Sequence, residues 1–72
     1  MNKINLKNVV WKEDKYYISW NLNTGISSFG KTKKEALAAL QEALELYFED
    51  TSISKINKVE KIDIVPSVFK YA

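Results

Sequence analysis

The chain has 72 residues with a formal net charge of +2, so it is one small domain whose single core stabilises the fold only marginally. It contains no cysteine and no histidine, which excludes a disulfide framework and removes the usual metal ligand and general base. No apolar run reaches the roughly twenty residues of a membrane span, and the N-terminus lacks a secretion signal, so we expect a soluble cytoplasmic protein.

The first half of the chain predicts three antiparallel strands. The first runs through Val9, Val10 and Trp11, and the polar residues 12–15 fit a hairpin loop. The second strand alternates with period two, which puts an apolar set on one side and a second set on the other. The apolar set is Tyr16, Ile18, Trp20 and Leu22, and the other set is Tyr17, Ser19 and Asn21. Residues 23–25 signal a turn, and residues 26–29 predict a short third strand that ends at Gly30.

A helix is predicted from about Lys33 to Glu49. Gly30 permits a backbone angle that other residues resist, and Thr32 can cap the helix through its hydroxyl. Glu35 can reach back to the amide of Thr32 and complete a capping box. The apolar residues then form one helical stripe of Ala36, Leu37, Leu40, Ala43, Leu44, Tyr47 and Phe48. We expect this stripe to cover the apolar side of the strands.

The last part of the chain predicts a fourth strand. Residues 50–58 are mostly polar, and residues 59–65 alternate so that Ile62 and Ile64 would point inward. Pro66 cannot donate a ladder hydrogen bond and ends the strand or confines it to an edge. The expected fold is therefore α+β, a strand-strand-strand-helix-strand domain over residues 1–72. It has two layers, with one helix on one face of a three-stranded antiparallel meander. The partner of the last strand stays open, with a parallel, right-handed crossover as one possibility.

One stretch of the sequence resembles a known family. The pattern Gly25-x4-Gly30-x-Thr32-x-x-Glu35-Ala36-Leu37, followed by the helical residues 42–47, is similar to the HicB antitoxin family and its single-domain relatives. Typical members place prolines in the turn before the first glycine, where this chain has Asn21 to Gly25. The resemblance implies a partial ribonuclease H-like fold.

This resemblance also implies a function. HicB antitoxins bind HicA toxins, which are small RNA-cleaving proteins, and cover their catalytic surface. Many members carry a C-terminal DNA-binding segment, but only six residues follow Pro66 here, so we expect no separate DNA-binding domain. We therefore expect a non-catalytic module that neutralises a HicA-like toxin encoded nearby. The alternative is a solitary dimeric domain of the same fold that binds another protein or RNA.

Because a ribonuclease H-like fold can hold two metal ions on clustered carboxylates, we looked for such a cluster in the sequence. The acidic residues of the predicted strands do not form one. Glu60 and Asp63 have opposite parity and point to opposite faces of a strand. Thr32 has no accompanying base, and neither glycine precedes a lysine-hydroxyl pair of a phosphate loop. We expect no enzyme activity, no cofactor and no metal, and we assign Gly25, Gly30, Thr32 and Glu35 structural roles.

Protein association has the better support. Glu42, Glu45 and Glu49 share the polar face of the helix, which indicates a solvated face and a surface that could attract a basic toxin. For self-association, most simply as a homodimer, the candidates are Leu46, Val68, Phe69 and Tyr71. For the tail residues Val68, Phe69 and Tyr71, folding back onto the domain is the equal alternative to pairing with another chain.

Direct nucleic-acid binding is not expected. Three lysines cluster at the helix start, and Tyr17 could stack on a base if it points outward. However, all eleven basic residues are lysine, and arginine is the residue that reads guanine and clamps phosphate with two hydrogen bonds.

Overall fold

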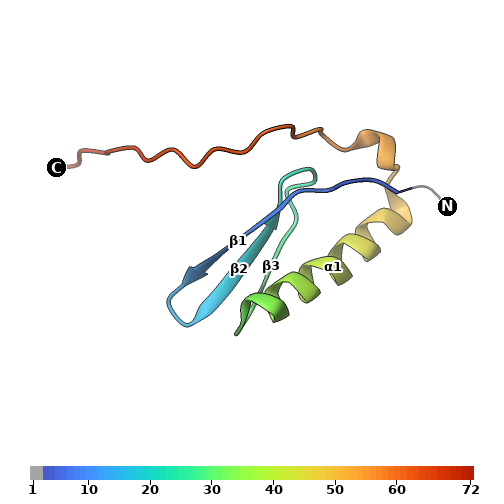
Figure 1. The fold of residues 1–72 in the computed structure, drawn as a ribbon, viewed down its shortest axis with the longest axis horizontal. Coiled ribbons are helices and arrows are strands. Elements are labelled where there is room, and N and C mark those ends of the chain that lie inside the picture. Colours follow the sequence, from blue (N-terminus) through green and yellow to red (C-terminus); the bar gives the residue numbers. More distant parts are fainter. Residues whose placement is uncertain (1–2) are drawn as a thin grey trace.

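The computed structural model describes residues 3–72 and contains a three-stranded sheet with one long helix beside it (Figure 1). The elements are β1 (Asn8–Glu13), β2 (Tyr16–Asn21), β3 (Ser27–Gly30), α1 (Lys33–Asp50) and a short 3-10 turn at Ile53–Lys55. The sheet order is β1-β2-β3, and both pairs are antiparallel. The predicted α+β meander and its helix are therefore confirmed.

The connections between strands are tight. Only Asp14 and Lys15 separate β1 from β2, and Asp14 has a φ of 55°, the left-handed conformation that such turns require. Gly25, in the turn between β2 and β3, has a φ of 81°. Gly25 is therefore the glycine needed for its backbone angle.

Gly30 is required for a different reason from the one predicted. Its φ is not in the left-handed region, but a Cβ at this position would lie 2.6 Å from the Ala36 nitrogen. The end of β3 thus lies directly against the first turn of α1. Gly30 provides space for that contact rather than an unusual backbone angle.

The start of α1 confirms half of the predicted capping box. Thr32 Oγ1 accepts a hydrogen bond from the Glu35 amide at 3.0 Å. The reciprocal bond is displaced by one residue, because Glu35 Oε1 accepts from the Lys31 amide at 3.1 Å and not from Thr32. Two backbone amides near the first turn of the helix, those of Lys31 and Glu35, therefore have side-chain hydrogen-bond acceptors.

The helix lies on the side of the sheet that the sequence suggested would face solvent. The Ser19 hydroxyl donates to the Ala36 carbonyl oxygen at 2.7 Å, and both residues are fully buried. Residues of β2 with the same parity as Ser19, including Tyr17 and Asn21, therefore share the helix-covered face. The prediction that α1 covers the apolar side of β2 is wrong, as is the idea of an outward Tyr17. The small Ser19 side chain lets the helix backbone approach closely, which a Trp or Ile would prevent.

The buried core is small. Ala36, Leu40 and Leu44 are the buried apolar residues, all from the predicted stripe of α1. The buried Asn21 is satisfied, since its Nδ2 donates to Asn8 Oδ1 at 2.7 Å and its Oδ1 accepts from the amide and hydroxyl of Thr24. Among the described residues, every buried side-chain polar atom has a partner.

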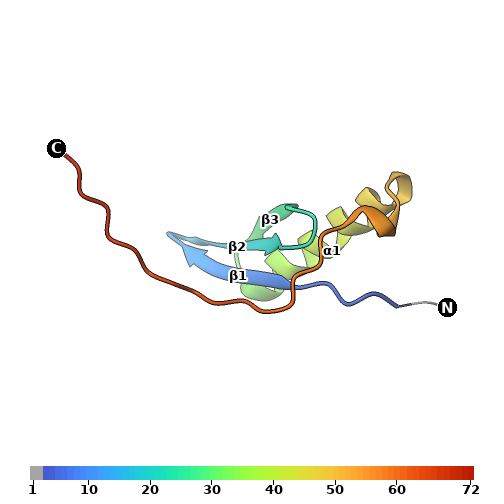
Figure 2. The same cartoon turned by 90° about the horizontal axis from the view of Figure 1, so that it is seen from above.

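The predicted fourth strand is absent from residues 57–72, which form no helix or strand. Figures 1 and 2 show this segment as extended chain that runs away from α1. Ile62 and Ile64, predicted to point inward, are 41% and 94% exposed. The prediction of a fourth strand is therefore wrong for this structure. Residues 59–65 have the alternating pattern of a strand, but no neighbouring strand pairs with them.

The placement of α1 on the Ser19 side of the sheet can be tested directly. Ser19→Lys would place a cation under α1 without a partner, so we expect the free energy of unfolding to fall by about 3 kcal/mol or more. Ser27→Lys is the matched control on the opposite face, where the side chain is exposed. We expect it to change stability by less than about 0.5 kcal/mol. Urea unfolding followed by circular dichroism measures both, and equal effects would contradict the placement of the helix.

The contact at Gly30 gives a second test. Gly30→Ala should cost about 1–3 kcal/mol, because the new methyl group overlaps the backbone of the first helical turn. Ser28→Ala in the same strand is the control and should cost less. A Gly30→Ala protein as stable as the original chain would show that β3 does not approach α1 this closely.

Candidate functional site

The side of the sheet opposite α1 is apolar, and no helix or strand within residues 3–72 covers it. Residues directly opposite each other in the register lie on one face, so Trp11, Ile18 and Phe29 form a row across the three strands. Val9 and Trp20 form the next row. We call the set Val9, Trp11, Tyr16, Ile18, Trp20 and Phe29 the open sheet face.

Aromatic residues on this face are exposed to an unusual degree. Phe29 is 63% exposed, and Trp11, Tyr16 and Trp20 are each about two-fifths exposed. The rings of Tyr16 and Phe29 meet edge to face, with centroids 5.9 Å apart. Contiguous apolar patches of this kind mark interaction sites, and Trp, Tyr and Phe are enriched in protein interfaces. The sequence signal for this face was its period-two pattern, which was assigned to the core.

A second feature is the polar clasp at Asn23, which ties three segments together. Asn23 Oδ1 accepts from the Lys7 amide at 2.8 Å, and Asn23 Nδ2 donates to the Asn57 carbonyl at 2.7 Å. The Asn57 amide donates back to the Asn23 carbonyl at 3.2 Å. This clasp fixes where the chain leaves the domain after α1.

Beyond the clasp lies the C-terminal arm, which we define as residues 59–72. Every residue from 60 to 72 is exposed. Val68, Phe69 and Tyr71 are three of the four predicted self-association residues. Each is more than four-fifths exposed, so the structure does not fold them back on the domain. The arm therefore presents apolar side chains that its own fold does not bury.

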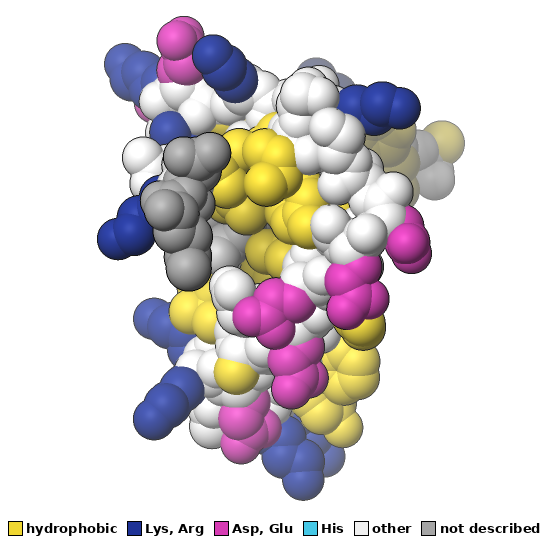
Figure 3. All heavy atoms as spheres, turned by 90° about the vertical axis from the view of Figure 1, so that its right-hand side faces the viewer, with side chains coloured by type: hydrophobic (Ala, Val, Ile, Leu, Met, Phe, Trp, Pro, Cys, Tyr) yellow, Lys and Arg dark blue, Asp and Glu magenta, His cyan; other side chains and the backbone are white. Residues whose placement is uncertain are grey.

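The third surface lies on α1. Glu42, Glu45 and Glu49 are all exposed, and Figure 3 shows acidic side chains gathered in a column on this face. Leu46 is 65% exposed and lies among them, because spacings of three and four residues bring side chains together on a helix. The last turn of α1 contains no basic residue. We call Glu42, Glu45, Leu46 and Glu49 the acidic helix surface.

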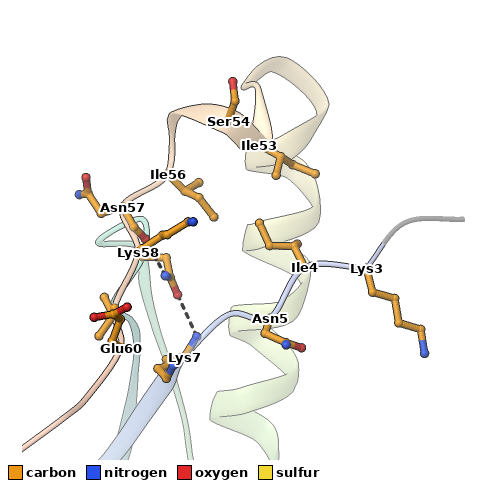
Figure 4. A pocket seen from close by; sticks show the side chains of 12 residues that line it. Lys3, Ile4, Asn5, Lys7, Ile53, Ser54, Ile56, Asn57, Lys58 and Glu60 are labelled. Carbon is orange, nitrogen blue, oxygen red and sulfur yellow. Dashed lines mark hydrogen bonds between the residues drawn. The ribbon is translucent and has the colours of Figure 1, made fainter.

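Two grooves flank the start of the chain. One of about 670 Å³ lies between the N-terminal segment and residues 53–60, with Ile4, Ile53 and Ile56 among its lining residues (Figure 4). The other, of similar volume, is lined by Leu44, Glu45, Phe48 and Glu49 together with residues 4–6 and 8 and Gln41. Within residues 3–72, no group of three or more acidic, histidine or cysteine side chains could hold a metal ion.

The remaining candidate residues do not gather in one place. Lys31, Lys33 and Lys34 are exposed at the start of α1, while Tyr17 is half-buried on the helix-covered face. The lysines and Tyr17 thus do not form the outward stacking surface considered from the sequence. No helix in residues 3–72 is long and apolar enough to cross a membrane.

Comparison with known proteins finds a family whose model matches this chain. The model of a family of unknown function, DUF7387, matches residues 2–70 and so covers nearly the whole chain. No curated protein and no solved structure matches the chain.

The clasp can be tested by one substitution. Asn23→Ala removes the acceptor of the Lys7 amide and the donor to the Asn57 carbonyl, so we expect the Lys7 amide to exchange with solvent about ten times faster or more. The Asn57 amide should change less, because its acceptor is the Asn23 backbone carbonyl, which alanine keeps. Asn5→Ala, at an exposed asparagine of the N-terminal segment, is the control. Hydrogen exchange measured by NMR reads both amides, and unchanged exchange in Asn23→Ala would show that the clasp does not hold these segments.

Proposed function

The chain belongs to the DUF7387 family, and we propose that it is a non-catalytic, antitoxin-like protein-binding module that neutralises a HicA-type RNA-cleaving toxin. The proposal rests on the resemblance of residues 25–47 to HicB antitoxins. The single structural observation that supports it most is the acidic helix surface, where an exposed leucine lies among three exposed glutamates. We place this activity in the cytoplasm.

The charge of this surface suits a basic partner. A protein that cleaves RNA needs positive charge around its substrate, and complementary charges speed association and exclude wrong partners. Leu46 adds an apolar anchor at the centre, and interface energy usually concentrates in a few such anchors. The acidic helix surface can therefore cover a basic catalytic surface and compete with RNA for binding to it.

Helix energetics give further support. The C-terminal end of a helix carries partial negative charge, so Glu49 and Asp50 in the last turn of α1 each cost a few tenths of a kcal/mol or more. No basic residue in that turn offsets them. Helix stability therefore does not explain these two acids, and their negative charge supports the proposal of a basic partner.

The proposal gives the chain no chemical step of its own. The sequence contains no histidine or cysteine, and Thr32 already accepts the Glu35 amide as the helix cap. Neutralisation in this account is steric and electrostatic, because the module occupies the surface where RNA would bind.

The test first asks whether the adjacent reading frame encodes a small basic protein, and then co-expresses that protein with this chain. We expect wild-type chain to form a complex with it and to relieve the growth arrest that it causes. The triple variant Glu42→Gln, Glu45→Gln, Glu49→Gln should weaken the complex at least tenfold in 150 mM salt and abolish the relief. Leu46→Ala should weaken it by a similar factor.

The matched control removes the same charge elsewhere. Glu13→Gln, Glu60→Gln and Asp63→Asn together neutralise three exposed acids outside α1. This control should keep affinity within about threefold of wild type, since distant surface charges are screened. Absence of any complex with the wild-type chain would refute the toxin partner, and equal losses in both triple variants would refute the acidic helix surface as the contact.

A further inference from the structure

We propose that two copies of this chain exchange their C-terminal arms. In this dimer, residues 59–65 of each copy add a fourth strand to the free edge of β1 in the other copy. The part of the arm beyond Pro66 then lies over the partner's open sheet face. The proposal uses the sheet and the arm rather than the acidic helix surface, so it stands independently of any toxin.

The exposed area of the chain is the first argument. The accessible surface is 6534 Å², whereas a compact monomer of 8.3 kDa is expected to expose about 4,600 Å². The excess is about 1,900 Å² per chain, and a standard interface buries about 800 Å² per partner. The chain therefore leaves more surface open than a standard dimer needs, as an exchanged arm requires.

The arm has the composition of a strand. Ile62 and Ile64 share one side of residues 59–65 by alternation, and both are exposed. Pro66 lacks an N–H and ends this stretch, which limits the added strand to residues 59–65. Val68 and Phe69 beyond it expose further apolar surface of the kind that covers aromatic patches.

The sheet offers the complementary edge. β1 is the outer strand of the order β1-β2-β3, and its six residues pair only with β2. An unpaired edge of this length is a template for another strand, and addition of a strand there satisfies backbone groups on both partners. Trp11 and Val9 of β1 lie on the open sheet face, next to where the added strand would run.

The direction of the arm favours a second copy over the same chain. The clasp at Asn23 holds Asn57 beside Lys7, just before β1 begins. From there the arm runs alongside β1 in the view of Figure 2, but Figure 1 shows it lying apart from the strands of its own sheet. The radius of gyration is 14.4 Å, compared with about 11 Å for a compact chain of this length. An arm held out in this way reaches a neighbour, and two-fold symmetry then makes the exchange reciprocal.

The first test measures the molecular mass of the protein in solution. Sedimentation of the full chain should give a dimer at 100 µM, and Ile62→Asp with Ile64→Asp should give a monomer with an unchanged helix signal in circular dichroism. Ala38→Asp is the control, because this exposed alanine lies on α1 outside the proposed contact. It should leave the dimer intact. A monomeric wild-type chain, or a dimer that survives both arm substitutions, would overturn the proposal.

A second measurement separates exchange from fold-back. Isotope-labelled and unlabelled chains are mixed by unfolding and refolding, and filtered NMR detects contacts between different copies only. Contacts from Ile62 and Ile64 of one copy to β1 of the other are expected. If the arm contacts only its own β1, or if the dimer forms without arm contacts, the exchange is refuted.

Discussion

The hydrogen bond from the Ser19 hydroxyl to the Ala36 carbonyl determines how the two layers of this small domain meet. It joins the centre of β2 to the first turns of α1 at 2.7 Å, with both residues fully buried. A small hydroxyl side chain at this position lets the helix backbone approach the sheet, and Gly30 does the same at the end of β3. Because the helix occupies this polar side, the larger apolar side chains of the strands are left on the other side.

The consequence is a domain with a small core and a large uncovered apolar surface. Ala36, Leu40 and Leu44 are its buried apolar side chains, while both tryptophans lie on the open sheet face. A chain near the lower size limit of stable domains gains from burying such a surface against a partner. The polar clasp at Asn23 fixes where the C-terminal arm leaves the domain, and in the proposed dimer this arm supplies the partner contact. The acidic helix surface is exposed on α1 and takes no part in the proposed dimer.

Much of the fold could be predicted from the sequence. The boundaries of α1 follow from Thr32 as cap and from the apolar stripe, and the turns follow from their glycine and polar residues. Period two correctly separated the two sides of β2, but it cannot tell which side a helix covers. The large apolar side chain of Trp20 suggested that Trp20 would face the helix. Instead the small Ser19 faces α1, because the helix backbone approaches the sheet closely at that position. The fourth strand was inferred from alternation alone, and alternation does not supply a ladder partner.

The candidate site was less accessible from the sequence. The glutamates of α1 and the residues of the arm were identified as binding candidates, but the open sheet face was assigned to the core. Leu46 was identified as a self-association candidate, and its place among the acids follows from spacings of three and four residues. The hydrogen bonds of Asn23 join residues 16 and 34 positions apart, so no local pattern signals them.

The most direct test uses the intrinsic fluorescence of Trp11 and Trp20, because the chain has no other tryptophan and both lie on the open sheet face. The emission maximum is followed during dilution from 100 µM to 0.1 µM alongside the molecular mass. The account predicts that emission shifts to the red as the dimer separates, since both rings then meet water. A blue emission maximum that does not change on dilution would mean that the chain's own helix covers the tryptophans, and it would contradict the placement of α1.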